Sequence, residues 1–291
     1  MKIFECVPNL SEGRDRAVLE KCARAVAATG VTLADQTSDD VHHRAVMTFF
    51  GTHDAVLAAS VALARVAVSA IDLRVHRGAH PRIGALDVLP FVPFGSATEA
   101  DAVEVAREAA RRIWDELRVP SFFYGAAGGG RLLAEVRRGG FEGLAARAGT
   151  FDVGDAAHPS AGAIAIGVRA PLVAFNVVLA SDNLALARRI ARTIRERDGG
   201  LRSLRALGIA LGNGRVQISC NLTDPAATPL WLVTALVRLL ARREGVAVVA
   251  TELIGLVPRA ALEDVVSHAF NVDELPHGRS APPGVDEGPR L

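Results

Sequence analysis

The sequence predicts an α+β fold made of two similar half-domains of the split βαβ, ferredoxin-like type. Apolar runs of strand length alternate with longer amphipathic segments of helical period. Two strand-like runs, residues 31–37 and 44–51, follow each other directly, which favours an antiparallel pair over a purely parallel sheet. The order strand, helix, two strands, helix, strand then recurs in the second half of the chain.

In the first half, short apolar runs predict strands and amphipathic segments predict helices. The predicted strands cover residues 3–8, 31–37, 44–51, 85–93 and 119–125, and the predicted helices cover 11–30, 54–71 and 96–117. Ser11 is the expected N-cap of the first helix, and Ser96 with Glu99 the expected capping box of the third. The helix at 54–71 is apolar nearly all round, so we expect it to be buried.

Residues 126–162 are rich in glycine and have weak periodicity, which predicts a long irregular segment with one helix inside it. Beyond it, strands are predicted at 171–179, 208–212, 215–222 and 246–258, and helices at 183–200, 228–245 and 258–270. We therefore expect an N-terminal subdomain over residues 1–171, a C-terminal subdomain over 172–275, and a disordered Pro/Gly-rich tail over 276–291.

Composition narrows the class of protein. The 291 residues carry a net charge of +1, so no overall field favours nucleic acid or an anionic membrane. The three cysteines form no CxxC motif, and the N-terminus lacks a signal peptide's long apolar region. No apolar run approaches the roughly 20 residues of a membrane span. We expect a soluble, cytoplasmic protein.

The densest polar cluster is HRGAHPRIGALDVLPFVP, residues 76–93, where His76, Arg77, His80 and Arg82 precede an apolar run. Histidine is the side chain whose ordinary pKa lies near neutrality, and Pro81 stiffens the position after His80, which makes His80 the preferred acid/base candidate. A loop histidine with local hydrogen bonds is one alternative. A metal site using His42, His43, His76 and His80 is another, although Gly78 and Pro81 argue against helical ligand spacing.

Four further stretches carry candidate binding residues. DQTSDDVHHRAV (35–46) is either a solvated turn or a site in which Arg44 binds a substrate carboxylate. CVPNLSEGRD (6–15) is either a capped helix start or an anion site. The glycine-rich stretch 158–179 is either a linker or a surface for a flat ligand. Asn176 and Asn221 lie in apolar strand sequence, where they either pair with each other or face a ligand.

Nucleotide chemistry and serine hydrolysis are disfavoured, because no Walker loop, G-x-G-x-x-G or G-x-S-x-G occurs. The motifs CVPNLSEGRD, HRGAHPRIGALDVLPFVP, VPSFFYG, RGGFEGL, AGAIAIGVR, PLVAFNVVL, VQISCNLTD and ELIGLVP instead occur in an order and spacing that resemble the glutamate formiminotransferase family. The resemblance runs from about residue 3 to 265, and no cyclodeaminase part is expected.

The resemblance implies transfer of a formimino group from N-formimino-L-glutamate to tetrahydrofolate, giving L-glutamate and 5-formiminotetrahydrofolate, in histidine degradation and one-carbon metabolism. It also implies two α/β subdomains with facing sheets and outer helices, tetrahydrofolate as co-substrate, and a homodimer. The family's catalytic histidine falls on His80, and no metal is implied. The folate-binding stretch falls on Gly154, Asp155, His158, Pro159, Ser160 and Gly162. The expected substrate-binding residues are Asn9, Asp35, Asp39, His43, Arg44, Arg82, Asn176 and Asn221.

Four positions depart from the family pattern, and three of them lose a carboxylate. Thr37 replaces the second aspartate of an Asp-x-Asp motif that begins at Asp35, Ala79 replaces a glutamate, Ala126 replaces another glutamate, and His43 replaces an asparagine. The role of stabilising a cation would then move to Asp39, Asp40 or His43. The alternatives are a relative that uses another one-carbon or amidine donor, and a folate-binding protein without catalysis.

Overall fold

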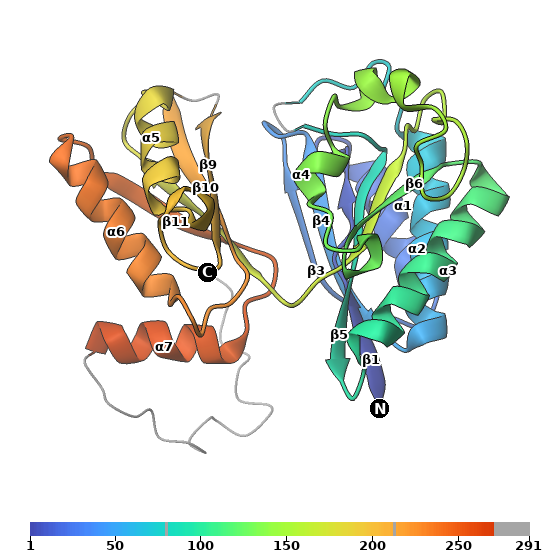
Figure 1. Cartoon of the computed structure of the whole chain (residues 1–291), viewed down its shortest axis with the longest axis horizontal. Coiled ribbons are helices and arrows are strands. Elements are labelled where there is room, and N and C mark those ends of the chain that lie inside the picture. Colours follow the sequence, from blue (N-terminus) through green and yellow to red (C-terminus); the bar gives the residue numbers. More distant parts are fainter. Residues whose placement is uncertain (79–80, 212–213, 271–291) are drawn as a thin grey trace. The chain divides into compact units, whose positions relative to one another are not determined.

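A computed structural model describes residues 1–78, 81–211 and 214–270 of the 291-residue chain (Figure 1). The chain divides into two compact units. Met1–Pro171 forms the body of the first unit, and the second is built chiefly from Leu172–Ala210 and Gly214–Leu253, with the chain from Val257 onward. The tail predicted over 276–291 lies outside the described residues.

The first unit contains a seven-stranded sheet. Its strands are β1 (Lys2–Cys6), β2 (Asn9–Leu10), β3 (Thr32–Asp39), β4 (Arg44–Gly51), β5 (Leu86–Gly95), β6 (Ser121–Gly125) and β7 (Ile164–Val168). β1 and β2 both pair antiparallel with β4 and with β5, so they act as one interrupted strand between these two. β3 pairs antiparallel with β4 at one edge, and β7 and β6 extend the sheet in parallel beyond β5.

Three helices cover one face of this sheet: α1 (Arg16–Ala27), α2 (His53–Ala70) and α3 (Glu99–Leu117) (Figure 1). Their buried side chains form one core with alternate strand residues such as Met47 and Phe91. Burying these apolar side chains supplies the main favourable free energy of the unit. Among the described residues, α2 alone has the length and hydropathy of a membrane span, and half of its 18-residue window is buried inside the protein.

The long segment 126–162 supplies a smaller core on the opposite face of the sheet. It contains the 3-10 helices η1 (Ala126–Gly128) and η2 (Phe141–Arg147) and the single-turn helix α4 (Leu133–Val136). Val136 and Leu144 from this segment pack against Val88 and Phe122 of the sheet. The irregular segment is therefore a packed layer with three short helical turns, where one helix was expected.

The second unit is a four-stranded sheet in the order β11-β8-β10-β9. Its elements are β8 (Val173–Leu179), α5 (Leu184–Ile194), η3 (Glu196–Asp198), β9 (Leu204–Leu211), β10 (Arg215–Leu222), α6 (Leu230–Arg243), β11 (Val248–Ile254) and α7 (Arg259–Phe270). α5 and α6 share a core with the sheet. This is the ferredoxin-like order, and the first unit has the same order before its extension by β7 and β6. The α+β prediction is confirmed.

Two predicted helix starts are wrong. α1 begins at Arg16 because the Asp15 carboxylate, not the Ser11 hydroxyl, accepts the first backbone N–H groups. The Ser11 hydroxyl instead donates to the carbonyl oxygen of Gly84 at 2.7 Å. α3 begins at Glu99 because Thr98 and Asp101 form the capping box. The predicted pair, Ser96 with Glu99, and the observed pair, Thr98 with Asp101, both match the sequence signature of a capping box. Only the backbone path distinguishes them.

One strand escaped prediction. β7 lies between β5 and β6, and all five of its residues are buried. A parallel strand covered on both faces has a continuous apolar sequence without alternation. The sequence 158–179 is open to interpretation as a linker or as a surface for a flat ligand, and its residues 164–168 form an internal strand of the sheet.

Candidate active site

One end of the first unit's sheet gathers most of the polar residues singled out by the sequence. β2 and β3 end there, and β4, β5, β6 and β7 begin there, as their pairing directions require. At Gly78 the backbone comes so close to the β3–β4 turn that an added Cβ would lie 2.6 Å from the carbonyl oxygen of His42. The loop before β5 is therefore packed against that turn.

Asp87 is the fully buried centre of this end of the sheet. Leu10 pairs with Leu86 and Asn9 pairs with Val88, so Asp87 is the extra residue of a β-bulge in β5. Its Oδ1 accepts hydrogen bonds from the backbone N–H groups of Ile83 at 2.7 Å and Gly84 at 3.3 Å. Such bonds favour the ionised carboxylate.

Arg44 and Arg137 both donate to the other oxygen of Asp87. The Nη1 of Arg44 lies 3.0 Å from Oδ2, and the Nη2 of Arg137 also donates to this oxygen. The Nε and Nη2 of Arg44 donate to Oδ1 of Asn9 at 3.0 and 2.6 Å. Burial and, to a lesser extent, the neighbouring Arg137 lower the pKa of Arg44 to about 10, although Asp87 raises it. Arg44 therefore stays charged at neutral pH, and the predicted residues Asn9 and Arg44 are in direct contact.

Sequence reasoning missed Arg137. The residue follows α4 directly, and Nη1 of Arg147 donates to the carbonyl oxygen of Val136 at 2.5 Å, which holds the end of that helix. The Arg147 guanidinium in turn lies 3.9 Å above the ring of Phe122. In the sequence Arg137 stands in an ordinary Arg-Arg pair within an irregular segment, so no periodicity or motif distinguished it.

Glu12 and His43 form a second charged pair. Oε1 of Glu12 accepts the backbone N–H groups of residues 13–15 and lies 3.0 Å from Nε2 of His43. Burial raises the pKa of Glu12, but these hydrogen bonds and His43 outweigh it, so the pKa is lowered. Because Nδ1 of His43 faces the carbonyl oxygen of Arg77 at 3.0 Å, both ring nitrogens face acceptors. The geometry assigns a His43 imidazolium beside a Glu12 carboxylate.

His76 is a neutral neighbour of this pair. Its ring stacks on that of His43 with centroids 4.1 Å apart. Nε of Arg82 donates to Nδ1 of His76 at 3.1 Å, so Nε2 carries the proton and faces the carbonyl oxygen of His43 at 3.2 Å. Burial lowers the pKa of His76, which also favours the neutral ring. Arg82, predicted to bind substrate, is paired with Glu142 at 3.0 Å in this structure.

The two predicted aspartates of β3 differ in environment. Asp39 accepts two backbone N–H groups and lies 2.7 Å from Nδ1 of His42, so it is already paired. Asp35 pairs in register with Thr48 of β4, and the bulge between Leu33 and Asp35 takes it to the face opposite the helical core. Asp35 Oδ2 and Thr48 Oγ1 are buried and have no hydrogen-bond partner among the described residues. Buried polar atoms of this kind need an explanation, such as a ligand.

The predicted folate stretch is divided between two environments. Gly154 packs under Trp114, where an added Cβ would lie 2.7 Å from the indole ring, and Asp155 follows it. His158 and Gly162 form a bridge whose backbone lies beside residues 83–85, and the carbonyl oxygen of Ser160 accepts the N–H of Leu73 at 2.8 Å. His158, Ser160 and Gly162, with Pro159 inside the turn, therefore lie beside the loop before β5, whereas Gly154 and Asp155 lie near the end of α3.

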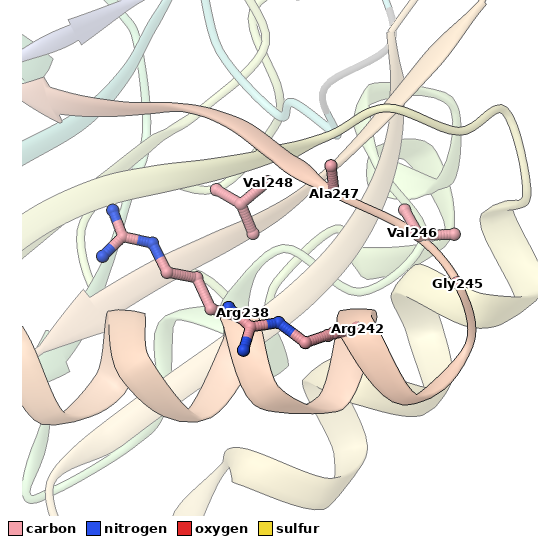
Figure 2. Close-up of a pocket in the computed structure, with 6 residues that line it drawn as sticks. All are labelled: Arg238, Arg242, Gly245, Val246, Ala247 and Val248. Atoms are coloured by element: carbon pink, nitrogen blue, oxygen red, sulfur yellow. The ribbon is translucent and has the colours of Figure 1, made fainter.

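Asn176 and Asn221 belong to the second unit. Asn176 pairs in register with Ser219, and Asn221 pairs with Ala174, so both amides lie on the sheet face opposite α5 and α6. No hydrogen bond joins them, so the internal-pair interpretation is not supported. A hollow of about 490 Å³ in this unit lies between α6 and the start of β11, lined by Arg238, Arg242 and residues 245–248 (Figure 2). It contains no carboxylate or histidine and offers no acid/base chemistry.

His80 lies outside the described residues, so its catalytic role stays a prediction. Cysteine chemistry is disfavoured, since all three thiols are buried and burial raises the pKa of Cys22 to about 11 and of Cys220 to about 12. Within residues 1–78, 81–211 and 214–270, no group of three or more His, Cys, Asp or Glu side chains could hold a metal ion.

The described groups can bind anions and one cation. Arg44, Arg137 and Asp87 together carry one net positive charge in a buried place, while Glu12–His43 and Asp39–His42 are internally paired. Asp35 is the carboxylate with an oxygen left unpartnered. This arrangement suits a ligand that has carboxylates at one end and a protonated nitrogen group at the other.

Comparison with known proteins identifies the family. Two family models match, the formiminotransferase domain N-terminal subdomain over residues 3–169 and the formiminotransferase domain over residues 174–275. A glutamate formimidoyltransferase of Streptococcus pyogenes is 39% identical over 94% of this chain and 95% of its own. A protein of the same name from Thermoplasma acidophilum is 37% identical over 96% and 95%. The chicken formimidoyltransferase-cyclodeaminase is also 37% identical, and the match covers 94% of this chain and 53% of that protein. The chain belongs to the formiminotransferase domain family.

Proposed function

We propose that the protein transfers the formimino group of N-formimino-L-glutamate to tetrahydrofolate, giving L-glutamate and 5-formiminotetrahydrofolate. The observation that carries this proposal is the 39% identity to a glutamate formimidoyltransferase over nearly the full length of both chains. The buried positive cluster around Asp87 supports it, since the donor carries two carboxylates. Tetrahydrofolate is the co-substrate, and the turn at residues 158–162 is its proposed binding segment beside the site.

In this reaction N5 of tetrahydrofolate attacks the amidine carbon and a new C–N bond forms. The proton on N5 must leave, and the glutamate nitrogen must gain a proton as its bond to the carbon breaks. A single histidine accepts the first proton and donates the second, which is the role we assign to His80. The neutral His76 and charged His43 are both held by local hydrogen bonds, so neither is the better candidate.

The protonated amidine needs a carboxylate beside it, and the residue we assign is Asp35. Asp39 and His43, two candidates for replacing the lost family acids, are committed to His42 and Glu12. Asp35 Oδ2 is buried and unpartnered, and Thr48 offers a hydroxyl next to it. Asp35, the surviving aspartate of the Asp-x-Asp motif, is therefore the residue assigned to this role, with the Thr48 hydroxyl beside it.

The deciding experiment incubates the purified protein with N-formimino-L-glutamate and tetrahydrofolate and follows the product after acid conversion to the absorbing methenyl form. We expect product with the wild type, loss of about 10²- to 10⁴-fold in turnover for His80→Ala, and retained folate binding. His53→Ala is the matched control, because His53 is a partly buried histidine at the start of α2 that pairs with Glu108 on α3. Unchanged turnover in His80→Ala would remove His80 from the mechanism.

A wild type that binds folate but forms no product would favour one of the two alternatives. Product with another amidine or one-carbon donor, tested with tetrahydrofolate held fixed, would indicate a changed substrate. Failure with every donor would indicate a folate-binding protein. The absence of three family acids is the observation that motivates this screen.

We further propose that the protein acts as a homodimer in the cytoplasm, with no nucleic-acid or membrane partner. Support comes from the net charge of +1, the three free cysteines, and exposed apolar side chains on α7, where Phe270 is 75% exposed. Light scattering on the purified protein tests the dimer, and a mass of 30.6 kDa, that of one chain, would contradict it. Fractionation of the source cells tests the location.

A further inference from the structure

We propose that Arg137 and Arg44 form a paired-arginine site, held by Asp87, that binds a carboxylate of the donor's glutamate moiety. This inference rests on the proposed function and assigns part of its substrate recognition. Arg44 was a substrate-binding candidate from sequence, but Arg137 and Asp87 were not. The proposal concerns the three side chains as one site.

The first step is the charge balance. Both guanidinium groups donate to the same oxygen of Asp87, so the single negative charge of this carboxylate is shared by two positively charged arginines. Side-chain exposure is 10% for Arg44, 13% for Arg137 and zero for Asp87, so water screens the excess positive charge poorly. The two guanidinium groups meet at one carboxylate oxygen, so they repel each other, and this repulsion contributes to the lowered pKa of Arg44. A bound anion would relieve this repulsion.

The second step is the supply of hydrogen-bond donors. A guanidinium has five N–H groups, and Arg137 uses one of them on Asp87. Its Nε is buried without a partner among the described residues. The planar fork of an arginine matches the two oxygens of a carboxylate. Arg137 therefore retains the donors that such a ligand needs.

The third step is the way the pair is held. Arg44 is fixed by Asn9 on β2, and Arg137 is fixed through Arg147, which braces the end of α4. The two arginines thus come from separate layers of the unit, the sheet and the segment that covers its open face. Asp87 also holds the backbone of Ile83 and Gly84. Binding at the pair is therefore linked to the backbone just before β5.

The test compares Arg137→Gln with the matched control Arg138→Gln, because Arg138 is the exposed neighbour and its side chain makes no described contact. We expect Arg137→Gln to raise KM for N-formimino-L-glutamate by about tenfold or more, with kcat and KM for tetrahydrofolate changed less than about threefold. Arg137→Lys keeps the positive charge but loses the planar fork of donors, so its KM for N-formimino-L-glutamate should lie between those of the wild type and Arg137→Gln. Trp114 fluorescence shows whether each variant is folded.

A second readout does not depend on turnover. Calorimetric titration with glutarate, a simple dicarboxylate, should show binding to the wild type and to Arg138→Gln, and binding weakened about tenfold in Arg137→Gln. Equal glutarate affinity in wild type and Arg137→Gln would overturn the proposal. A rise confined to KM for tetrahydrofolate would overturn the assignment to the donor. If the wild type forms no product, the proposed function fails, and the glutarate titration still tests the site.

Discussion

The two units share one strand order and differ in whether charged side chains are buried on the sheet face away from their helices. In the first unit this face and its end carry Asp35, Asp39, Arg44 and Asp87, with Arg137 contributed by the covering segment. In the second unit the corresponding face carries Asn176, Gln217, Ser219 and Asn221, which are uncharged, and two arginines, Arg205 and Arg215, which are exposed. The repeated βαββαβ topology therefore gives each unit one sheet face away from its helices on which polar residues can lie. The side chains on that face decide what the unit can bind.

The difference has a structural cause in the first unit. Strands β7 and β6 extend its sheet, and the segment between them folds back as a second layer over the open face. That layer removes water from Asp87 and brings Arg137 to it. The second unit ends at four strands and has no such layer from within the described part of its own chain. The extension thus buries charges that an open sheet face would leave screened by water and salt.

The largest expected effect comes from removing the buried carboxylate of the first unit. Asp87→Ala removes the buried carboxylate that two arginines share, and we expect the first unit to lose about 3–5 kcal/mol of unfolding free energy. The two tryptophans separate the units, because Trp114 lies in the first and Trp231 in the second. A Trp231→Phe background followed in urea reports the first unit alone. A loss below about 1 kcal/mol would show that the charges there are solvated.

The next effect concerns catalysis by the first unit's open face. Asp35→Asn removes the negative charge but keeps a similar shape, and we expect kcat/KM for the donor to fall about 10²-fold with little change in stability. Ser38→Ala, a change in an exposed side chain of the same strand, is the control. If Asp35→Asn kept full activity, another group would have to hold the protonated amidine.

Backbone strain in the proposed folate turn should give an intermediate effect. Gly162 has φ of +73°, and an added Cβ would lie 2.1 Å from the carbonyl oxygen of Ile83. We expect Gly162→Ala to lower the free energy of unfolding by about 1–3 kcal/mol and to weaken folate binding, measured by fluorescence titration. Gly143→Ala, where an added Cβ meets nothing within 4 Å, should be neutral or slightly stabilising. Equal behaviour of the two variants would contradict the role of this turn.

A smaller effect should appear on acidification. Burial lowers the pKa of His76 from 6.5. The hydrogen bond to the His43 backbone and the charge of Glu12 raise this pKa, whereas the charges of His43 and Arg82 lower it. The unfolded chain then binds the proton more tightly, so the stabilisation is present above pH 6.5 and is lost as the pH falls below it. We expect the first unit's unfolding free energy, measured by urea titration between pH 7.5 and 5, to fall less steeply in His76→Gln. Identical slopes would mean that His76 titrates alike in both states.

The smallest effect is expected on the second unit's sheet face away from its helices, where the charged residues Arg205 and Arg215 are exposed. Asn221 is exposed and no described side chain bonds to it, so Asn221→Ala should change stability by no more than about 0.5 kcal/mol. Trp231 fluorescence in urea measures this directly. A loss of unfolding free energy as large as that of Asp87→Ala would contradict the proposed difference between the two sheet faces. A selective loss of substrate affinity would instead support the predicted ligand contact of Asn221.

The sequence by itself determined the class of fold, the repeated element order and the family, because hydrophobic period and motif order are local features that one chain displays directly. It also identified Asn9 and Arg44, which the structure brings into contact. Only the tertiary structure decided that β7 is a central strand and that Ser11 bonds to Gly84 instead of capping a helix. It alone joined Arg137 to Asp87 across 50 residues, through a bulge and a covering layer that leave no periodic signal. Long-range pairing of charges depends on which surfaces meet, and no local pattern encodes that.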